Sequence, residues 1–309
     1  TDEGEILEAE PALCVITNCA NLDLESCQAM LQPGADEETT PRNGMLQTAL
    51  ELALILQRRR ISAGAVITER PDPVILLQDE NENTKVDIVD DPFAPLPHLV
   101  VGEFMILCNG AMASWAMKRD IPMLYRTQDV ALPREFAGVW TEPQDISRVV
   151  RALPPASLDT APKRHAGLGL SAYTNLTSPL RRYTDLLNQG QVLHYIKNSR
   201  PLYDVAELNA LLPLLSTRME AVTQAQRLRP RYWKLLFFRQ RGDKHWWNAV
   251  VADENDAFVT VSWPWAQLII RGRRRQFDEK TFPGQHIEVR LGKVNPLLNE
   301  IQILEVREA

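Results

Sequence analysis

The spacing of the apolar residues changes near residue 242, and this change constrains the fold more than any other feature of the chain. Before it, apolar residues recur every three or four positions, most clearly over Gly44–Arg60, as on one face of a helix. From Trp246 to Val306, short runs alternate apolar and polar residues, as in strands with one buried face. The sequence therefore predicts an α+β fold, in which a mixed helical and sheet domain over 1–241 precedes a small five-stranded β-barrel of the OB-fold kind over 242–309.

The same two periods place the individual elements. Helices are expected at Asp23–Leu31, Gly44–Arg60, Leu99–Lys118, Pro179–Lys197 and Val205–Arg241. Pro213 and Pro230 should interrupt the last helix, because proline has no backbone N–H to donate. Strands are expected at Ala12–Thr17, Ala65–Ile67 and Val74–Leu77, and then at five runs in the barrel: Ala249–Val251, Phe258–Val261, Gln267–Ile270, Ile287–Leu291 and Ile301–Leu304.

Length and composition indicate a globular protein of a reducing compartment. The chain has 309 residues, 45% of them hydrophobic, which is enough for two domains and a sizeable core. Apolar runs such as Ala49–Leu56 are too short to cross a bilayer, so no membrane association is expected. None of the four cysteines matches a zinc spacing, and we expect free thiols and a cytoplasmic monomer. The chain starts at Thr1 without a methionine or a basic leader, which suggests a piece of a longer protein.

Charge is distributed unevenly along the chain, and the distribution is more informative than the net charge of −6. Residues 1–100 contain 19 acidic and 6 basic residues, a balance of −13. Residues 101–309 contain 21 acidic and 28 basic residues, a balance of +7. The basic part suits a polyanion, which the acidic first third would help to steer.

A cluster of hydroxyl-bearing and basic residues around Pro179 carries the clearest chemical signal. Thr177 or Ser178 is expected to cap a helix whose first residue is Pro179. Arg181 and Arg182 would then lie in its first turn, where positive charge opposes the helix dipole at a cost of about a few tenths of a kcal/mol each. Hydroxyls, free backbone N–H groups and two guanidinium groups that meet at one helix end predict a phosphate site.

A less specific interpretation fits the same residues. Asp185 follows Arg181 by four positions, so the two side chains would form an ordinary ion pair on a solvated helix face. The helix end would then be structural rather than a binding site.

Four segments resemble, in order, the motifs of the ribonuclease II family, whose catalytic region is the RNB domain. Glu103–Asn109 resembles the family's Glu-Phe-Met-x-x-x-Asn helix, and Ile121–Arg126 resembles its Pro-x-x-Tyr-Arg element. His165–Leu170 resembles the approach to the signature block, and Tyr173–Leu186 resembles the block itself, with Thr-Ser-Pro followed by two arginines, a tyrosine and an aspartate. With the C-terminal barrel, where the family has an OB-fold RNA-binding domain, the resemblance covers nearly the whole chain.

This resemblance implies a 3′→5′ exoribonuclease that hydrolyses single-stranded RNA processively to 5′-nucleoside monophosphates, with Mg²⁺ held by aspartates. It implies that Arg181 contacts the scissile phosphate and that Arg182 and Tyr183 complete the catalytic set. The expected RNA-binding residues are Tyr173, Thr177, Ser178, Glu103, Asn109, Tyr125, Arg126, Gln226, Arg227, Arg273 and Arg274.

Two basic stretches support the RNA-binding prediction. The last long helix carries basic residues from Arg227 to Arg241, interleaved with aromatics that are expected to be core. In the barrel, Arg273 and Arg274 follow Trp263 and Trp265, a combination that suits a single strand but also an ordinary solvated loop.

The family's aspartate pattern, Asp-x5-Asp-x-Asp-Asp, is missing from the chain. The nearest cluster, Asp87, Asp90 and Asp91, has the wrong spacing and is expected to be a solvated turn. No metal ligand is therefore expected in this chain, because hydrated Mg²⁺ needs clustered carboxylates. Either the ligands lie upstream, or the protein is a degenerate homologue that binds RNA, or another partner, without cleavage.

Two further departures concern the ends of the RNA path. Ile67 stands near the position where the family clamps a base with an aromatic residue, and Gln226 stands where it has a glutamate. These changes put base clamping and product release in question more than phosphate binding.

Overall fold

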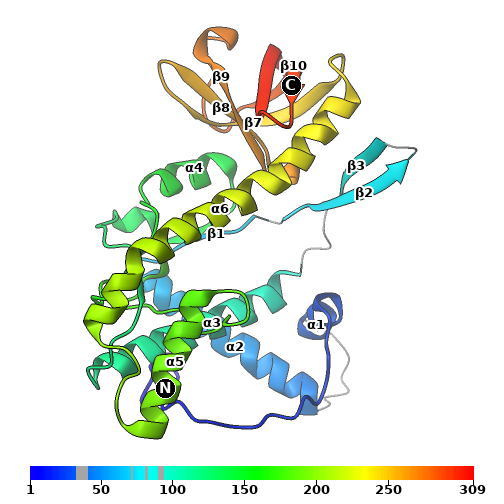
Figure 1. Cartoon of the computed structure of the whole chain (residues 1–309). Coiled ribbons are helices and arrows are strands. Elements are labelled where there is room, and N and C mark those ends of the chain that lie inside the picture. Colours follow the sequence, from blue (N-terminus) through cyan, green and yellow to red (C-terminus); the bar gives the residue numbers. More distant parts are fainter. Residues whose placement is uncertain (33–40, 71, 81–82, 90–93) are drawn as a thin grey trace. The chain divides into compact units, whose positions relative to one another are not determined.

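The computed structural model describes residues 1–32, 41–70, 72–80, 83–89 and 94–309. They fall into two compact units that each draw on separate stretches of chain. The first consists of Thr1–Ile67, Ala94–Gly138 and Leu153–Thr217, and the second of Thr68–Phe93, Val139–Ala152 and Arg218–Ala309. Helices and sheets are mixed, as expected for the α+β class (Figure 1).

The first unit is built on α1 (Leu24–Leu31), α2 (Pro41–Ser62), α3 (Pro95–Met117), α5 (Tyr183–Asn198) and the N-terminal part of α6 (Val205–Arg241). Asp23 caps α1 through its carboxylate, which accepts from the Ser26 N–H at 2.7 Å. Trp115 of α3 and Val192 of α5 share a buried cluster with Met123, Tyr125 and Leu176. The sequence predicted α1, α2 and α3, each within a few residues at its ends.

A buried ion pair joins α2 to α3. Arg60 donates to Glu103 through two nitrogens, one at 2.8 Å, and Nη1 donates to the Leu168 carbonyl at 3.1 Å. The side chains are 9% and 4% exposed. Such a pair contributes little net stability, but its separation is costly because one charge would stay buried without a partner.

Helix α3 is long and apolar enough to cross a membrane when judged by length and composition alone, so the expectation that no stretch reaches this length was wrong. This is weak support for a membrane span, because a core helix passes the same test. In the structure α3 buries Glu103 and Asn109, and both are hydrogen-bonded to other segments of the unit.

The remaining first-unit elements are short. Strand β4 (Tyr125–Thr127) pairs with β6 (Ser157–Asp159), and β1 (Val66–Thr68) pairs with β5 (Gly138–Trp140). The 3₁₀ turns are Arg134–Phe136 and Ala166–Leu168.

The predicted strand at Ala12–Thr17 was wrong. The segment pairs with no other strand in the described part of the chain, and Val15 and Ile16 are 99% and 86% exposed. A run of β-forming residues becomes a strand only where an edge accepts its hydrogen bonds.

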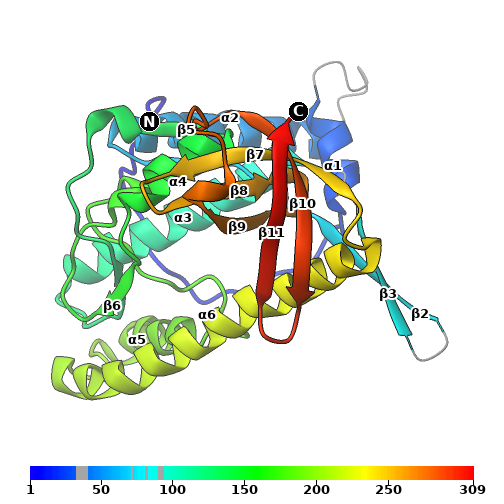
Figure 2. The same cartoon turned by 90° about the horizontal axis from the view of Figure 1, so that it is seen from above.

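The second unit contains a curled antiparallel sheet of five strands, which confirms the expected C-terminal β-structure (Figure 2). The strand order is β11-β10-β7-β8-β9, and the side chains on its inner face, such as Val259, Val261 and Trp263, are fully buried. A hairpin, a short helix and the C-terminal part of α6 complete the unit. The bounds are β7 (Trp246–Glu254), β8 (Phe258–Trp263), β9 (Leu268–Arg273), β10 (His286–Asn295), β11 (Glu300–Glu308), β2 (Val74–Glu80), β3 (Asn83–Val89) and α4 (Pro143–Arg151), with 3₁₀ turns at Pro264–Ala266 and Arg274–Gln276.

The long helix α6 (Val205–Arg241) runs unbroken through Pro213 and Pro230, so the predicted interruptions were wrong. A proline removes one N–H and bends a helix, but it ends the helix only if packing does not hold the flanking turns. Here Leu208 and Leu215 are buried before the second proline, and Leu235–Phe238 are buried after it.

We expect Glu103→Ala to lower the free energy of unfolding by about 3–5 kcal/mol, because it leaves the Arg60 charge buried and unpaired. Urea unfolding followed by circular dichroism measures the change. The control is Glu5→Ala, whose partner Arg59 is 3.3 Å away in an exposed pair, and which should cost less than about 1 kcal/mol. Equal losses in the two variants would contradict the assigned role of the buried pair.

Candidate nucleic-acid interface

Helix α5 begins at Tyr183, not at Pro179, which corrects the predicted cap. The segment before it is a turn in which Arg182 N donates to the Ser178 carbonyl at 2.9 Å. Ser178 N donates to the Asp185 carboxylate at 2.8 Å, so this N–H is not free for a ligand. The helix starts four residues after the predicted position. The carboxylate of Asp185, in the first turn of α5, accepts the N–H of Ser178 and so holds that residue outside the helix.

Asp185 is fully buried and is paired with Arg182 rather than Arg181. Arg182 Nη2 donates to Asp185 Oδ1 at 2.7 Å and lies 3.5 Å from Thr177 Oγ1. Arg182 Nε is buried and has no hydrogen-bond partner in the described part of the chain. The alternative of a solvated Asp185–Arg181 pair was therefore wrong in both partner and burial.

Arg181 is exposed, and among the described residues no hydrogen bond or ion pair holds its guanidinium group. The neighbouring Leu180 is fully exposed, and Tyr183 is 59% exposed. The turn thus presents a free cation together with apolar surface, a combination that suits the phosphate and the base of a nucleotide.

Asn109 connects α3 by hydrogen bonds to the signature segment, Tyr173–Leu186. Its Nδ2 donates to the Tyr173 hydroxyl at 2.9 Å and lies 3.4 Å from Thr177 Oγ1, while Oδ1 accepts from Leu176 N at 3.0 Å. Because Asn109 is 1% exposed and fully engaged, it fixes Tyr173 and Thr177 in position rather than reaching a ligand itself.

Arg126, at the end of the Pro-x-x-Tyr-Arg element, is half-buried. Its backbone N donates to the Tyr173 carbonyl at 2.8 Å, which places β4 beside the signature segment. Burial, and then the charge of Arg182, lower the pKa of Arg126, so the two cations are neighbours. No carboxylate pairs with the Arg126 guanidinium within the described residues. A desolvated cation without a counter-ion is costly, and a bound anion would offset that cost.

His165 packs against the same site. Its ring meets Tyr173 edge to face at 5.7 Å, and its buried Nδ1 has no hydrogen-bond partner among the described residues. Burial, and then the charge of Arg126, lower the pKa of His165 to about 4. Its imidazole is therefore neutral near pH 7.

These side chains form a cationic site with one carboxylate, Asp185, which Arg182 already occupies. Its members come from four stretches of the first unit: α3, β4, the segment at His165, and Tyr173–Leu186. Arg126 in such a site can bind a phosphodiester, and Arg181 is exposed on the turn that precedes α5. Among the residues that the structure describes, no group of three or more His, Cys, Asp or Glu side chains could hold a metal ion. Asp90 and Asp91 lie outside these residues, and Asp87 pairs with Arg241 at 3.1 Å.

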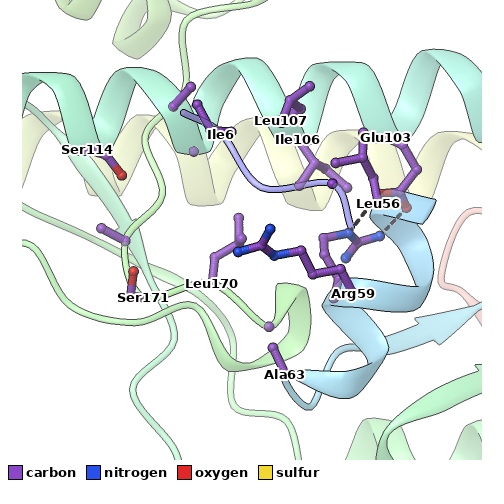
Figure 3. Close-up of a pocket in the computed structure, with 16 residues that line it drawn as sticks. Ile6, Leu56, Arg59, Ala63, Glu103, Ile106, Leu107, Ser114, Leu170 and Ser171 are labelled. Carbon is purple, nitrogen blue, oxygen red and sulfur yellow. Dashed lines mark hydrogen bonds and ion pairs between the residues drawn. The ribbon is translucent and has the colours of Figure 1, made fainter. Parts of the chain in front are cut away.

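Two of the predicted RNA-binding residues lie in the core of the first unit. Glu103 is engaged with Arg60 beside a pocket of about 240 Å³, which Leu56, Ile106 and Leu170 also line (Figure 3). Tyr125 is 2% exposed, and burial raises its pKa to about 12. Because both side chains are buried, neither can contact RNA directly in this structure.

The other predicted residues lie in the second unit. Gln226, Arg227 and Arg273 are exposed, whereas Arg274 donates to the carbonyls of Asp278 and Glu279, both at 2.7 Å. Trp263 cannot form a binding surface with Arg273 and Arg274, because its side chain is fully buried in the core of the curled sheet. This part of the predicted strand-binding surface was wrong.

Sequence reasoning missed that Asp185 is the buried anchor of the turn. The spacing of three from Arg182 to Asp185 permits their pair, but the same spacing serves exposed pairs, so burial could not be inferred from it. Arg60 was also missed, since its partner lies far away in sequence.

The RNB domain matches residues 1–198, which is more than half of the chain. The chain therefore belongs to the RNB domain family.

Curated relatives extend the similarity beyond that region. The chain is 25% identical over 252 residues to an uncharacterized ribonuclease of Synechocystis, covering 80% of this chain and 37% of that protein. It is 28% identical over 264 residues to the chloroplastic/mitochondrial ribonuclease II of Arabidopsis thaliana, covering 79% and 30%. The chain thus spans about a third of the length of these relatives.

Solved structures share the fold. The Dss1 exoribonuclease of Candida glabrata gives a TM-score of 0.76 at 21% identity, covering 93% of this chain and 38% of that one. Ribonuclease R of Mycoplasma genitalium, in complex with ribose-methylated single-stranded RNA, gives 0.67 at 14% identity, covering 87% and 51%. Yeast Ssd1, described as a pseudonuclease, gives 0.57 at 16% identity, covering 88% and 38%.

The lowered pKa of His165 predicts a loss of stability in acid. The unfolded chain takes up this proton near pH 6.5 and the folded chain only near pH 4, so stability falls as the pH is lowered between these values. We expect His165→Phe, which keeps the ring beside Tyr173, to reduce the fall in Tm between pH 7 and pH 4.5. His98→Gln, at an exposed position on α3, is the control and should follow the parent chain. A parent-like pH profile for His165→Phe would contradict the assignment.

Proposed function

We propose that this chain is the RNA-holding part of a 3′→5′ exoribonuclease of the ribonuclease II type, which degrades single-stranded RNA to 5′-nucleoside monophosphates. The supporting observation is the cationic site in the first unit, where Arg126 and Arg181 lack any carboxylate partner in the described residues. Homologues named ribonuclease II and the RNA-bound ribonuclease R support the same substrate class.

Each residue has a distinct part in this proposal. Arg181, on the exposed turn, contacts the scissile phosphate, and Arg126 binds the same backbone from the side of β4. Arg182 shapes the turn through Asp185 and supports Arg181. The exposed ring of Tyr183 offers a surface for the terminal base or ribose.

Hydrolysis by this class uses Mg²⁺, and the described residues do not fit that ion, because no cluster of carboxylates is present among them. In this proposal the metal ligands come from outside the described part of the chain. The residues shown here bind and orient the backbone but activate no water.

A second candidate is an RNA-binding protein that does not cleave. The structural neighbour described as a pseudonuclease has this fold, and Gln226 replaces a family carboxylate. Both candidates require RNA to bind at Arg126 and Arg181. They differ in whether the complete protein releases nucleotides in the presence of Mg²⁺.

We expect the chain to bind single-stranded RNA with an affinity that falls steeply with salt, since each phosphate contact releases a counter-ion. Arg126→Gln should weaken the binding of a labelled oligouridine about tenfold or more, the loss of about one charged hydrogen bond. Fluorescence anisotropy at several salt concentrations measures both effects. Arg200→Gln removes an exposed cation of the same unit and should leave affinity within about twofold. Equal affinities for the two variants would remove Arg126 from the interface.

We expect no Mg²⁺-dependent hydrolysis of this RNA by the isolated chain, because the described residues offer no carboxylate cluster. Gel analysis of end-labelled RNA with and without Mg²⁺ tests this directly. In a complete, active protein, Arg181→Ala should lower kcat far more than RNA affinity. Robust cleavage by the isolated chain would show that the metal ligands had been misplaced, and equal losses of kcat and affinity would remove Arg181 from the reacting phosphate.

A further inference from the structure

A basic cleft of about 590 Å³ lies within the second unit, along one face of α6. Arg227, Arg231 and Lys234 line it at spacings of four and three residues, so the three cations share that face. The opposite walls include Asp72 and Gln267. Three like charges in one stripe weaken a helix, which indicates that the stripe serves another purpose.

Lys234 is buried to a degree that is unusual for an unpaired lysine. Its side chain belongs to a residue that is only 9% exposed, and its ammonium group donates to the Gln267 carbonyl at 3.2 Å. Within the described residues no carboxylate forms an ion pair with it. Burial lowers the pKa of Lys234, the Asp72 carboxylate raises it in part, and Arg231 and Arg70 lower it further, so the charge of Lys234 is only partly compensated.

Arg231 is in a similar position. Its Nε donates to Asn299 Oδ1 and its Nη1 donates to the Ile269 carbonyl at 3.0 Å, which orients the guanidinium group at the cleft. Burial lowers its pKa as well. Two neutral acceptors fix the side chain but leave its charge uncompensated.

The acidic content of the cleft is small. Asp72 is the one carboxylate among the lining residues that the structure describes, against three cations, which gives a lining charge of +2. Gln226, on the rim, carries an amide where the resembled family has a glutamate. An amide does not repel an anion, so this departure agrees with an anion-binding cleft.

We propose that this cleft binds a phosphate group, carried either by the RNA backbone or by a free nucleoside monophosphate. An ammonium group and two guanidinium groups that converge on one cavity match a phosphate in charge and in number of donors. The cleft shares no residue with the Arg126 and Arg181 site, and phosphate alone can test it, so it stands without the function proposed above.

The probes are inorganic phosphate, AMP and a labelled oligouridine, with binding measured by calorimetry and anisotropy. All variants are made in the parent chain and in the Arg126→Gln chain, which removes the contribution of the first-unit site. We expect Lys234→Met to weaken phosphate and AMP binding at least tenfold. The matched control, Lys244→Met, removes an exposed lysine just beyond α6 and should leave binding unchanged.

Two further measurements separate a ligand role from a structural role. Lys234→Met should keep or raise Tm, because it replaces a desolvated cation by an apolar chain. In the Arg126→Gln chain, phosphate should then raise Tm only where Lys234 is retained. Gln226→Glu, at an exposed position that does not affect packing, should also weaken phosphate binding by adding negative charge to the rim.

The binding of the labelled oligouridine shows whether the phosphate in this cleft belongs to the RNA backbone or to a free nucleotide. A loss of RNA affinity in Lys234→Met assigns the cleft to the RNA backbone, whereas unchanged RNA affinity with lost AMP binding assigns it to a free nucleotide. Unchanged binding of phosphate and AMP in both Lys234→Met and Gln226→Glu, or no phosphate binding by the Arg126→Gln chain, would overturn the proposal.

Discussion

The buried carboxylate of Asp185 organises the signature segment, and the candidate interface depends on it. One oxygen accepts from the Ser178 N–H and from Arg182, and the other accepts from the Thr184 hydroxyl at 3.3 Å. Because of these bonds, the Arg182 side chain and the Ser178 N–H stabilise the turn and are not available to a ligand. What is left for a ligand is the exposed guanidinium of Arg181, whose backbone N–H donates to the Ser178 carbonyl at 3.2 Å within the same turn.

Desolvated cations without carboxylate partners recur in the two units. Arg126 in the first unit and Lys234 in the second are partly or largely buried, and burial lowers the pKa of each. A chain that minimised its free energy alone would replace such side chains by apolar ones. In the two proposals above, a bound anion offsets the cost of these charges.

The fold was predictable where the periodicity of the sequence was strong. Helix α2 and the five strands of the sheet follow from helical and alternating apolar spacing, because each buries one face. The errors occur where tertiary contacts, rather than local sequence, determine the secondary structure. Ala12–Thr17 has β-forming residues but pairs with no strand among the described residues, and α6 stays helical through Pro230 because buried residues hold the flanking turns.

The site was predictable in its residue types but not in its pairing. The order of Arg181, Arg182 and Asp185 indicated a phosphate site, yet only the folded chain shows which arginine is neutralised. That distinction has a chemical consequence. In the proposed function, unpaired cations bind a phosphodiester and draw charge from its oxygens, whereas the activation of water needs metal ligands that the described residues do not supply. Under the proposed function, Arg126 contributes to RNA binding and Arg181 contacts the reacting phosphate, while the groups that activate water lie outside the described residues.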